Sequence, residues 1–135
     1  MATRSRIGME MPNGEVRSIY CHWDGYAHRE ILTGFYMNPQ KVEALIELGD
    51  ISILGESLIP LGDISILGTH GAINIPGVTH TFDNPAPGVT VAYHRDRGED
   101  YNPARVDMNI ESFAKSDFEE YGYVFTQQGE WITFV

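Results

Sequence analysis

The stretch IGMEMPNGEVRSIYCHW, residues 7–23, decides the fold that we expect for this chain. Apolar residues alternate with other residues on both sides of Asn13-Gly14, and that dipeptide is a strong short-range signal for a tight β-hairpin turn. In the second arm, Ile19 and Cys21 share one face, because side chains alternate between the two faces of a strand. The sequence therefore predicts that the fold opens with two antiparallel strands.

Two short helices are expected between residues 27 and 49, where the apolar residues change to helical spacing. Asn38 followed by Pro39 fits a helix N-cap with proline at the first helical position. Gly49 fits the C-terminal stop of the same helix. The second helix is thus bounded at both ends by sequence signals.

A repeated octapeptide follows, because LGDISILG occurs at residues 48–55 and again at residues 61–68. Two copies are too few for a solenoid, so we interpret the repeat as a tandem duplication within a loop. The chain then stays rich in Gly, Pro, Asn and Thr up to residue 88. We therefore expect a single domain over residues 1–135, with a long and partly irregular insertion at about 50–88.

The last third of the chain predicts a strand, a helix and a second hairpin. VTVAYHRD, residues 89–96, resumes the strand pattern, and apolar residues at helical spacing follow Asp107 and Asn109, both suitable N-caps. Two aromatic and β-branched runs, residues 121–126 and 131–135, flank a turn that contains glycine. The element order predicts an α+β fold: a mostly antiparallel sheet built from N- and C-terminal hairpins plus a middle strand, with the helices packed on one face.

Composition and charge narrow the classes of partner. The net charge is −10 and the chain has only nine Lys and Arg residues, so no basic stripe is available and duplex nucleic acid is not an expected partner. The chain contains no apolar run of the roughly 20 residues that a membrane span needs, and its first residues lack the apolar core of a signal peptide. We expect a protein of the cytoplasm with no membrane partner.

The familiar signatures of large enzyme classes are absent from the sequence, including the phosphate-binding loop, the dinucleotide fingerprint and the Cys-x-x-Cys and His-Glu-x-x-His motifs. No cofactor is therefore expected, and a binding protein is favoured over an enzyme. The single cysteine, Cys21, is interpreted as a small buried hydrophobic residue, because no base lies beside it in the sequence to activate the thiol.

Two segments carry the candidate site: YCHWDGY at residues 20–26 and YHRDRGED at residues 93–100. Aromatic rings offer stacking surfaces for bases, carboxylates accept hydrogen bonds from ribose or base, and the planar fork of arginine suits phosphate. The structural alternatives are a tryptophan in the core and a set of local ion pairs in the second segment. The predicted ligand-binding residues are Tyr20, His22, Trp23, Asp24, Tyr26, Tyr93, Arg95, Arg97 and Glu99.

A metal site is the alternative interpretation of the same segments. His22-x-Asp24 and His94-x-Asp96 each place a histidine and a carboxylate on one face of a predicted strand. If the two strands were neighbours, these four side chains would hold a divalent cation and activate water for phosphodiester hydrolysis. The other histidines, among them His28, are expected at the surface.

The chain resembles a family of small, uncharacterised proteins of phages and prophages that carries the motifs SIYCHWDGY, here residues 18–26, and YxRDRGE, here residues 93–99. The likeness extends to the TRSRI start at residues 3–7 and to HTFDNP at residues 80–85, and the duplicated LGDISILG departs from it. The resemblance implies a phage origin and the cytoplasm of an infected bacterium. It brings no assigned activity.

Three functional hypotheses follow. The leading one is a phage accessory protein that binds and sequesters a small nucleotide-like ligand, such as an immune signal of the host. The first alternative is a metal-dependent phosphodiesterase that cleaves such a nucleotide. The second is an acidic protein inhibitor that covers a host defence protein. A homo-oligomer with its ligand site between subunits is compatible with so small a chain.

Overall fold

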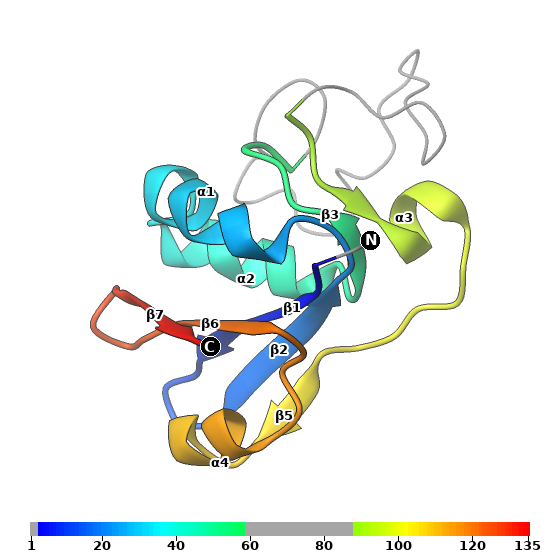
Figure 1. Cartoon of the computed structure of the whole chain (residues 1–135). Helices are drawn as coiled ribbons and strands as arrows, with labels where there is room; N and C mark the ends of the chain where they lie inside the picture. The colour runs from blue at the N-terminus through cyan, green and yellow to red at the C-terminus, as the bar shows by residue number, and fades with distance from the viewer. Residues whose placement is uncertain (1–2, 59–87) are drawn as a thin grey trace.

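The computed structural model describes residues 3–58 and 88–135, and Figure 1 shows the whole chain. Within the described residues, seven strands form one mixed sheet. The strands are β1 (Ser5–Glu10), β2 (Val16–Cys21), β3 (Ile51–Ile53), β4 (Val91–Ala92), β5 (Arg105–Asp107), β6 (Tyr121–Phe125) and β7 (Trp131–Phe134). Their order across the sheet is β4-β3-β2-β1-β6-β7, and β5 pairs with β2 off this path. The helical segments are η1 (Gly25–Ala27), α1 (His28–Phe35), α2 (Pro39–Glu47), α3 (Tyr93–Arg97) and α4 (Ile110–Lys115).

Both predicted hairpins are confirmed, and they meet at the centre of the sheet. β1 pairs antiparallel with β2 across the Asn13-Gly14 turn, and β6 pairs antiparallel with β7. β1 also pairs in parallel with β6, so that Ile7 lies opposite Tyr123. This parallel pairing joins the two ends of the chain and makes the sheet mixed.

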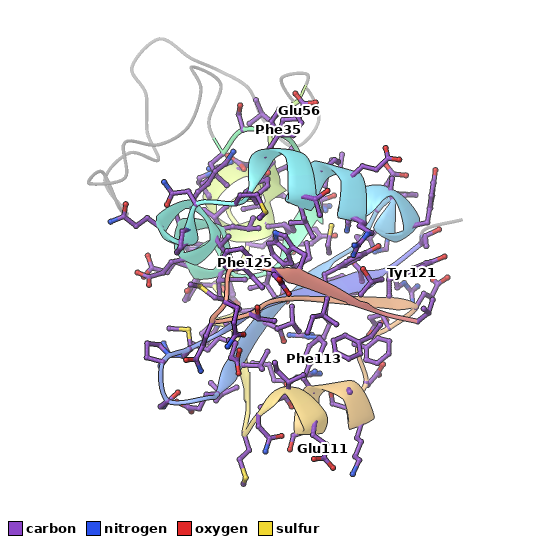
Figure 2. The ribbon with its side chains drawn as sticks, turned by 90° about the vertical axis from the view of Figure 1, so that its left-hand side faces the viewer. Phe35, Glu56, Glu111, Phe113, Tyr121 and Phe125 are labelled. Carbon is purple, nitrogen blue, oxygen red and sulfur yellow. The ribbon has the colours of Figure 1, made fainter. Side chains whose placement is uncertain are left out.

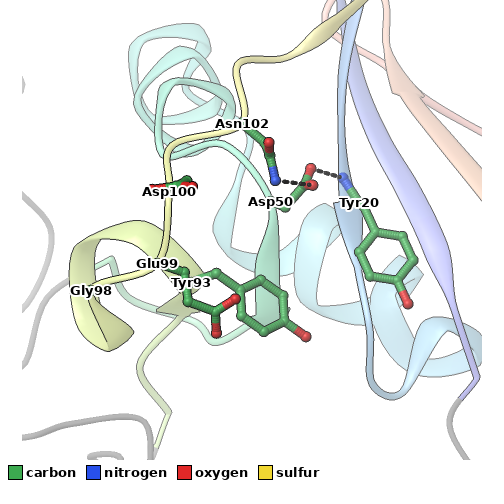
Figure 3. A pocket seen from close by; sticks show the side chains of 7 residues that line it. All are labelled: Tyr20, Asp50, Tyr93, Gly98, Glu99, Asp100 and Asn102. Carbon is green, nitrogen blue, oxygen red and sulfur yellow. Dashed lines mark hydrogen bonds between the residues drawn. The ribbon is translucent and has the colours of Figure 1, made fainter.

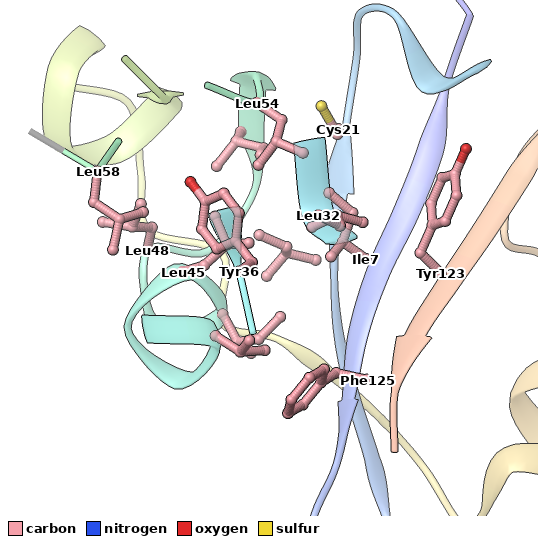
Figure 4. Packing of buried hydrophobic residues seen from close by; sticks show 14 of the residues in the cluster. Ile7, Cys21, Leu32, Tyr36, Leu45, Leu48, Leu54, Leu58, Tyr123 and Phe125 are labelled. Carbon is pink, nitrogen blue, oxygen red and sulfur yellow. The ribbon is translucent and has the colours of Figure 1, made fainter. Parts of the chain in front are cut away.

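The helices α1 and α2 cover one face of this sheet (Figures 1 and 2). The predicted N-cap is confirmed, because the Asn38 side chain accepts a hydrogen bond from the backbone N–H of Gln40 at 2.8 Å. Beneath these helices lies the main core, part of which is drawn in Figure 4. Its largest fully buried side chains include those of Tyr36, Tyr123, Phe125, Ile7, Ile19, Leu32 and Leu45.

A second, smaller core lies on the opposite face, where α4 packs (Figure 2). Val16, Phe113 and Val124 form it, and Val124 points away from the main core because side chains alternate along β6. Gly122 makes room for α4, since a Cβ there would lie 3.0 Å from the Phe118 ring. The α+β class is confirmed, and the structure shows helices on both faces of the sheet rather than on one.

The region after the insertion differs from the prediction. The strand expected at residues 89–96 is only β4, two residues long, and the chain then turns into α3. The turn is stabilised by the Asp96 carboxylate, which accepts a hydrogen bond from the backbone N–H of Ala92 at 2.7 Å. The first copy of the octapeptide contains β3, and the second copy lies outside the described residues. The short strand β5 was not predicted.

Candidate functional site

A pocket of about 630 Å³ lies beside β2, along the edge where β3 and β5 pair with different residues of this strand. β5 pairs with residues 16–18 of β2, whereas β3 pairs with its last residue, Cys21. Tyr20 lies between these pairings, and its backbone N–H donates to the Asp50 carboxylate at 3.0 Å instead of to a strand. Figure 3 shows this pocket. It is lined by Tyr20, Asp50, Tyr93, Gly98, Glu99, Asp100 and Asn102.

Asp50 connects the elements that meet at the pocket. Its carboxylate accepts from the Tyr20 N–H and lies 3.5 Å from the Asn102 amide nitrogen. Its backbone carbonyl accepts from the N–H of Tyr93 at 3.2 Å. Asp50 is therefore held in place by hydrogen bonds to β2, to α3 and to the segment that follows α3.

The outer wall of the pocket, residues 98–102, is fixed against α2. The Tyr101 hydroxyl donates to the carbonyl of Glu47 at 2.9 Å, and the His94 Nδ1 lies 2.8 Å from the carbonyl of Glu99. Gly49 allows the wall to come close, because a Cβ at this position would lie 2.5 Å from the carbonyl oxygen of Asn102. Gly49 also has a φ of 77°, a left-handed conformation that favours glycine.

Two neutral tyrosines form the aromatic part of the site. Burial raises the pKa of both Tyr20 and Tyr93, so both phenols keep their proton at neutral pH. The Tyr20 hydroxyl lies 2.7 Å from the Nδ1 of His22. The Arg97 guanidinium carbon lies 5.9 Å from the centroid of the Tyr93 ring. Each tyrosine ring is thus held beside a second polar group at the edge of the pocket.

Three of the nine predicted ligand-binding residues line the pocket: Tyr20, Tyr93 and Glu99. Two more, His22 and Arg97, contact these lining residues. The structure therefore brings the two predicted segments together, although they are more than 60 residues apart in the sequence.

The remaining residues of the first segment lie outside the pocket. Trp23 follows the end of β2 and its side chain is 39% exposed, so it belongs neither to the pocket lining nor to the core. Its ring meets the ring of His22 edge-on, with centroids 4.8 Å apart. Asp24 adopts a left-handed backbone conformation before η1, and Tyr26 is 63% exposed.

Arg95, one of the predicted ligand-binding residues, does not line the pocket. Its side chain is only 4% exposed. The guanidinium donates to the backbone carbonyls of Leu58 at 2.5 Å and Thr90 at 2.7 Å, and it pairs with the Asp96 carboxylate at 2.9 Å. The cation that the sequence suggested for phosphate instead joins the backbone at Leu58 to the backbone at Thr90.

The predicted metal ligands do not form a cluster. His94 and Asp96 lie in α3 rather than on a strand, and residues two apart on a helix do not share a face. The Asp96 carboxylate is already bonded to the Ala92 N–H and to Arg95. Within residues 3–58 and 88–135, no group of three or more His, Cys, Asp and Glu side chains is arranged to hold a metal ion.

His28 is buried, although the sequence placed it at the surface. Its side chain is 1% exposed, and its Nδ1 lies 2.9 Å from the Ser5 hydroxyl while its Nε2 lies 2.9 Å from the carbonyl of Trp23. Burial lowers the pKa of His28 to about 4. Cys21 is buried as predicted, and burial raises the pKa of its thiol to about 12.

Sequence reasoning missed the polar residues that complete the site: Asp50, Asp100 and Asn102. The signal for Asp50 was its place directly after the Gly49 helix stop and before a β-branched run, which puts a carboxylate at the start of a strand. Comparisons with protein-family models, with curated proteins and with solved structures find no match to this chain. Among the described residues, no helix is long and apolar enough to cross a membrane.

Proposed function

We propose that this protein binds and sequesters a small nucleoside-like or nucleotide-like ligand in the pocket between Tyr20 and Tyr93. In keeping with the resemblance described above, the proposed setting is the cytoplasm of a phage-infected bacterium, where the ligand is a signal of the host defence. The observation that carries the proposal is the convergence of two distant aromatic segments on one pocket of about 630 Å³. That volume is typical of sites for small molecules.

The lining chemistry suits a base joined to a sugar. Aromatic rings stack on the faces of bases, and each stacked base contributes about 1–3 kcal/mol in proteins that bind single strands. The carboxylates of Asp50, Glu99 and Asp100 accept hydrogen bonds from ribose hydroxyls and base amino groups, and the Asn102 amide both donates and accepts. The Tyr20 hydroxyl already contacts the Nδ1 of His22, so the tyrosines contribute their rings to the proposed contact.

Several features support binding rather than catalysis. The Cys21 thiol is buried with its pKa raised to about 12, so it is not a thiolate nucleophile. The described residues contain no cluster arranged to hold a metal ion. His28 is buried away from the pocket lining and bonded at both ring nitrogens. The contact between Tyr20 and His22 is the arrangement at the pocket best suited to proton transfer, so turnover must be measured directly.

The test is to incubate the protein with linear and cyclic nucleotides and nucleosides, remove it by filtration, and identify compounds in the filtrate and in heat-released material by mass spectrometry. Sequestration predicts a compound that is depleted from the filtrate and recovered unchanged. A converted product would show an enzyme instead. If none of the compounds is depleted or converted, the proposed function is wrong.

Variants locate the site. Tyr20→Leu and Tyr93→Leu remove one ring each and should weaken binding at least about fivefold, which corresponds to the lower end of the stacking contribution, about 1 kcal/mol. Tyr26→Leu is the matched control, because Tyr26 belongs to the first segment but does not line the pocket. Equal losses in all three variants would contradict the assignment of the pocket.

A second candidate function is favoured by the exposed aromatic residues outside the pocket. Trp23 and Tyr26 are 39% and 63% exposed and flank Asp24 on one short segment of an acidic protein. Aromatic residues beside charged ones are typical anchors of protein interfaces. An inhibitor of a host defence protein would co-purify with that protein, and the double variant Trp23→Ala/Tyr26→Ala would lose it while keeping nucleoside binding.

A further inference from the structure

We infer that the pocket selects an unphosphorylated nucleoside, prefers one whose base is positively charged, and rejects phosphate. This inference rests on the function proposed above and specifies the ligand class of the same site. Three observations support it: the carboxylates that line the pocket, the contacts that already engage Arg95 and Arg97, and the neutral aromatic rings of Tyr20 and Tyr93.

The pocket lining carries more negative than positive charge. Asp50, Glu99 and Asp100 contribute carboxylates. Arg97 pairs with Glu99 at 2.7 Å and balances that one charge. Asp50 is held by neutral donors, and within the described part of the chain no cationic side chain forms an ion pair with Asp50 or Asp100. Arg6 lies near enough for the Asp50 charge to raise the pKa of Arg6, but Arg6 does not line the pocket. Among the described residues, the lining itself therefore holds three carboxylates and no cationic side chain.

Both arginines of the second predicted segment are already engaged in contacts within the protein. Arg95 is buried and bonds to two backbone carbonyls and to Asp96. Arg97 lies over the Tyr93 ring and pairs with Glu99. A phosphate in the pocket would face carboxylates at short range, in a protein whose net charge is −10. Each phosphate added to a nucleoside should therefore weaken binding.

The tyrosines favour a positive charge on the stacked ring. Tyrosine phenols are neutral at pH 7, because their ordinary pKa is about 10, so both rings present electron-rich faces. Such faces attract cations, and the attraction is stronger where water is partly excluded. A metal cation does not fit, because the described residues offer no set of ligands for one. A flat organic cation, such as a methylated purine nucleoside, would stack on a ring face that Arg97 does not cover and would face the carboxylates.

The experiment measures binding of adenosine, 1-methyladenosine, AMP and ATP by calorimetry at pH 7 and moderate salt. 1-Methyladenosine carries a positive base and should bind about tenfold more tightly than adenosine, through cation–π and charge attraction. AMP should bind about fivefold more weakly than adenosine, and ATP more weakly still. Affinities that rise from adenosine to AMP to ATP would overturn the inference while leaving the proposed function intact. Binding of none of the four would overturn both.

Neutral variants identify the source of the preference. Asp50→Asn/Asp100→Asn keeps the side-chain shapes and should reduce the ratio of the two nucleoside affinities from about tenfold to near one. Glu30→Gln/Glu43→Gln removes the same charge from the exposed faces of α1 and α2 and should leave the ratio unchanged. Asp100 is exposed, so Asp100→Asn alone should leave the fold intact and lower the ratio of the two nucleoside affinities about threefold. This single variant keeps the test valid if Asp50→Asn disturbs the fold. Equal ratios in the wild type and all variants would show that the carboxylates do not select charge.

Discussion

His28 occupies a position in the main core that an apolar residue would ordinarily take. The Ser5 hydroxyl donates to Nδ1, which leaves Nε2–H to donate to the carbonyl of Trp23, and the Cys21 sulfur lies 3.6 Å from Nε2. One neutral imidazole thereby links β1, the end of β2 and the start of α1. Both ring nitrogens are bonded, so the buried polar group is satisfied and the cost of its burial is offset.

The burial of His28 predicts a dependence of stability on pH. Its pKa is about 4 in the folded protein and 6.5 in the reference state, so the unfolded chain takes up the proton first as pH falls. The stabilisation is fully present above about pH 6.5 and is lost as pH falls towards 4. The free energy of unfolding should decrease by about 1 kcal/mol between pH 7 and 5.5, measured by urea denaturation. The His28→Gln variant should be less stable at pH 7, and its free energy of unfolding should change less between pH 7 and 5.5. An equal change in both proteins would contradict the assignment.

Arg95 and Arg97 form a natural pair of test positions, because one is buried and the other exposed. Arg95→Lys should destabilise the fold by about 2 kcal/mol, since a lysine cannot serve two carbonyls and a carboxylate in the same geometry. Arg97→Lys should change stability by less than about 0.5 kcal/mol, because exposed ion pairs contribute little. Urea denaturation measures both. If Arg95→Lys left the stability unchanged but weakened ligand binding, the phosphate-binding hypothesis for Arg95 would be restored.

At the scale of elements, the structure confirms the predictions that rested on local signals. Asn13-Gly14 specified the first hairpin, the Asn38 cap marked the start of α2, and of the two caps predicted for α4, Asp107 and Asn109, the structure uses Asn109. The parallel pairing of β1 with β6 and the short strand β5 depend on contacts between distant segments, which no local pattern reveals. The turn from β4 into α3 depends on a side-chain hydrogen bond within five residues and was mistaken for a strand.

The wall at residues 98–102 gives a prediction at this scale. Gly49→Ala places a Cβ where only 2.5 Å separates it from the carbonyl of Asn102, and the residue must also hold a φ of 77°. We expect a stability loss of at least about 1 kcal/mol together with a loss of ligand affinity, because the wall must move away from α2. Thermal unfolding and calorimetric binding measure the two effects.

Gly34→Ala provides the matched control for that variant. Gly34 lies in α1, and no atom stands within 4 Å of the position that a Cβ would take. Alanine should therefore stabilise this helix by about 0.5–1 kcal/mol and leave binding unchanged. If both glycine variants bound nucleosides like the wild type, the wall would not be part of the site.

At the scale of the whole molecule, the site forms because the sheet edge at β2 is divided between β3 and β5. The sequence identified Tyr20, Tyr93 and Glu99, since aromatic and charged residues cluster visibly in their segments. It did not identify Asp50, because the role of this residue depends on which strands meet there. It also assigned Arg95 to a ligand, because the carbonyls that occupy this arginine come from a segment 37 residues away and from near β4.

The measurement that tests the central proposal most directly is a titration of ¹⁵N-labelled protein with 1-methyladenosine, followed by amide chemical shifts. Binding in the proposed pocket predicts that the largest changes fall on Tyr20, Tyr93 and Gly98, while amides of α4, such as that of Phe113, which does not line the pocket, keep their shifts. Changes centred on α4, or no changes at millimolar nucleoside, would contradict the proposed site.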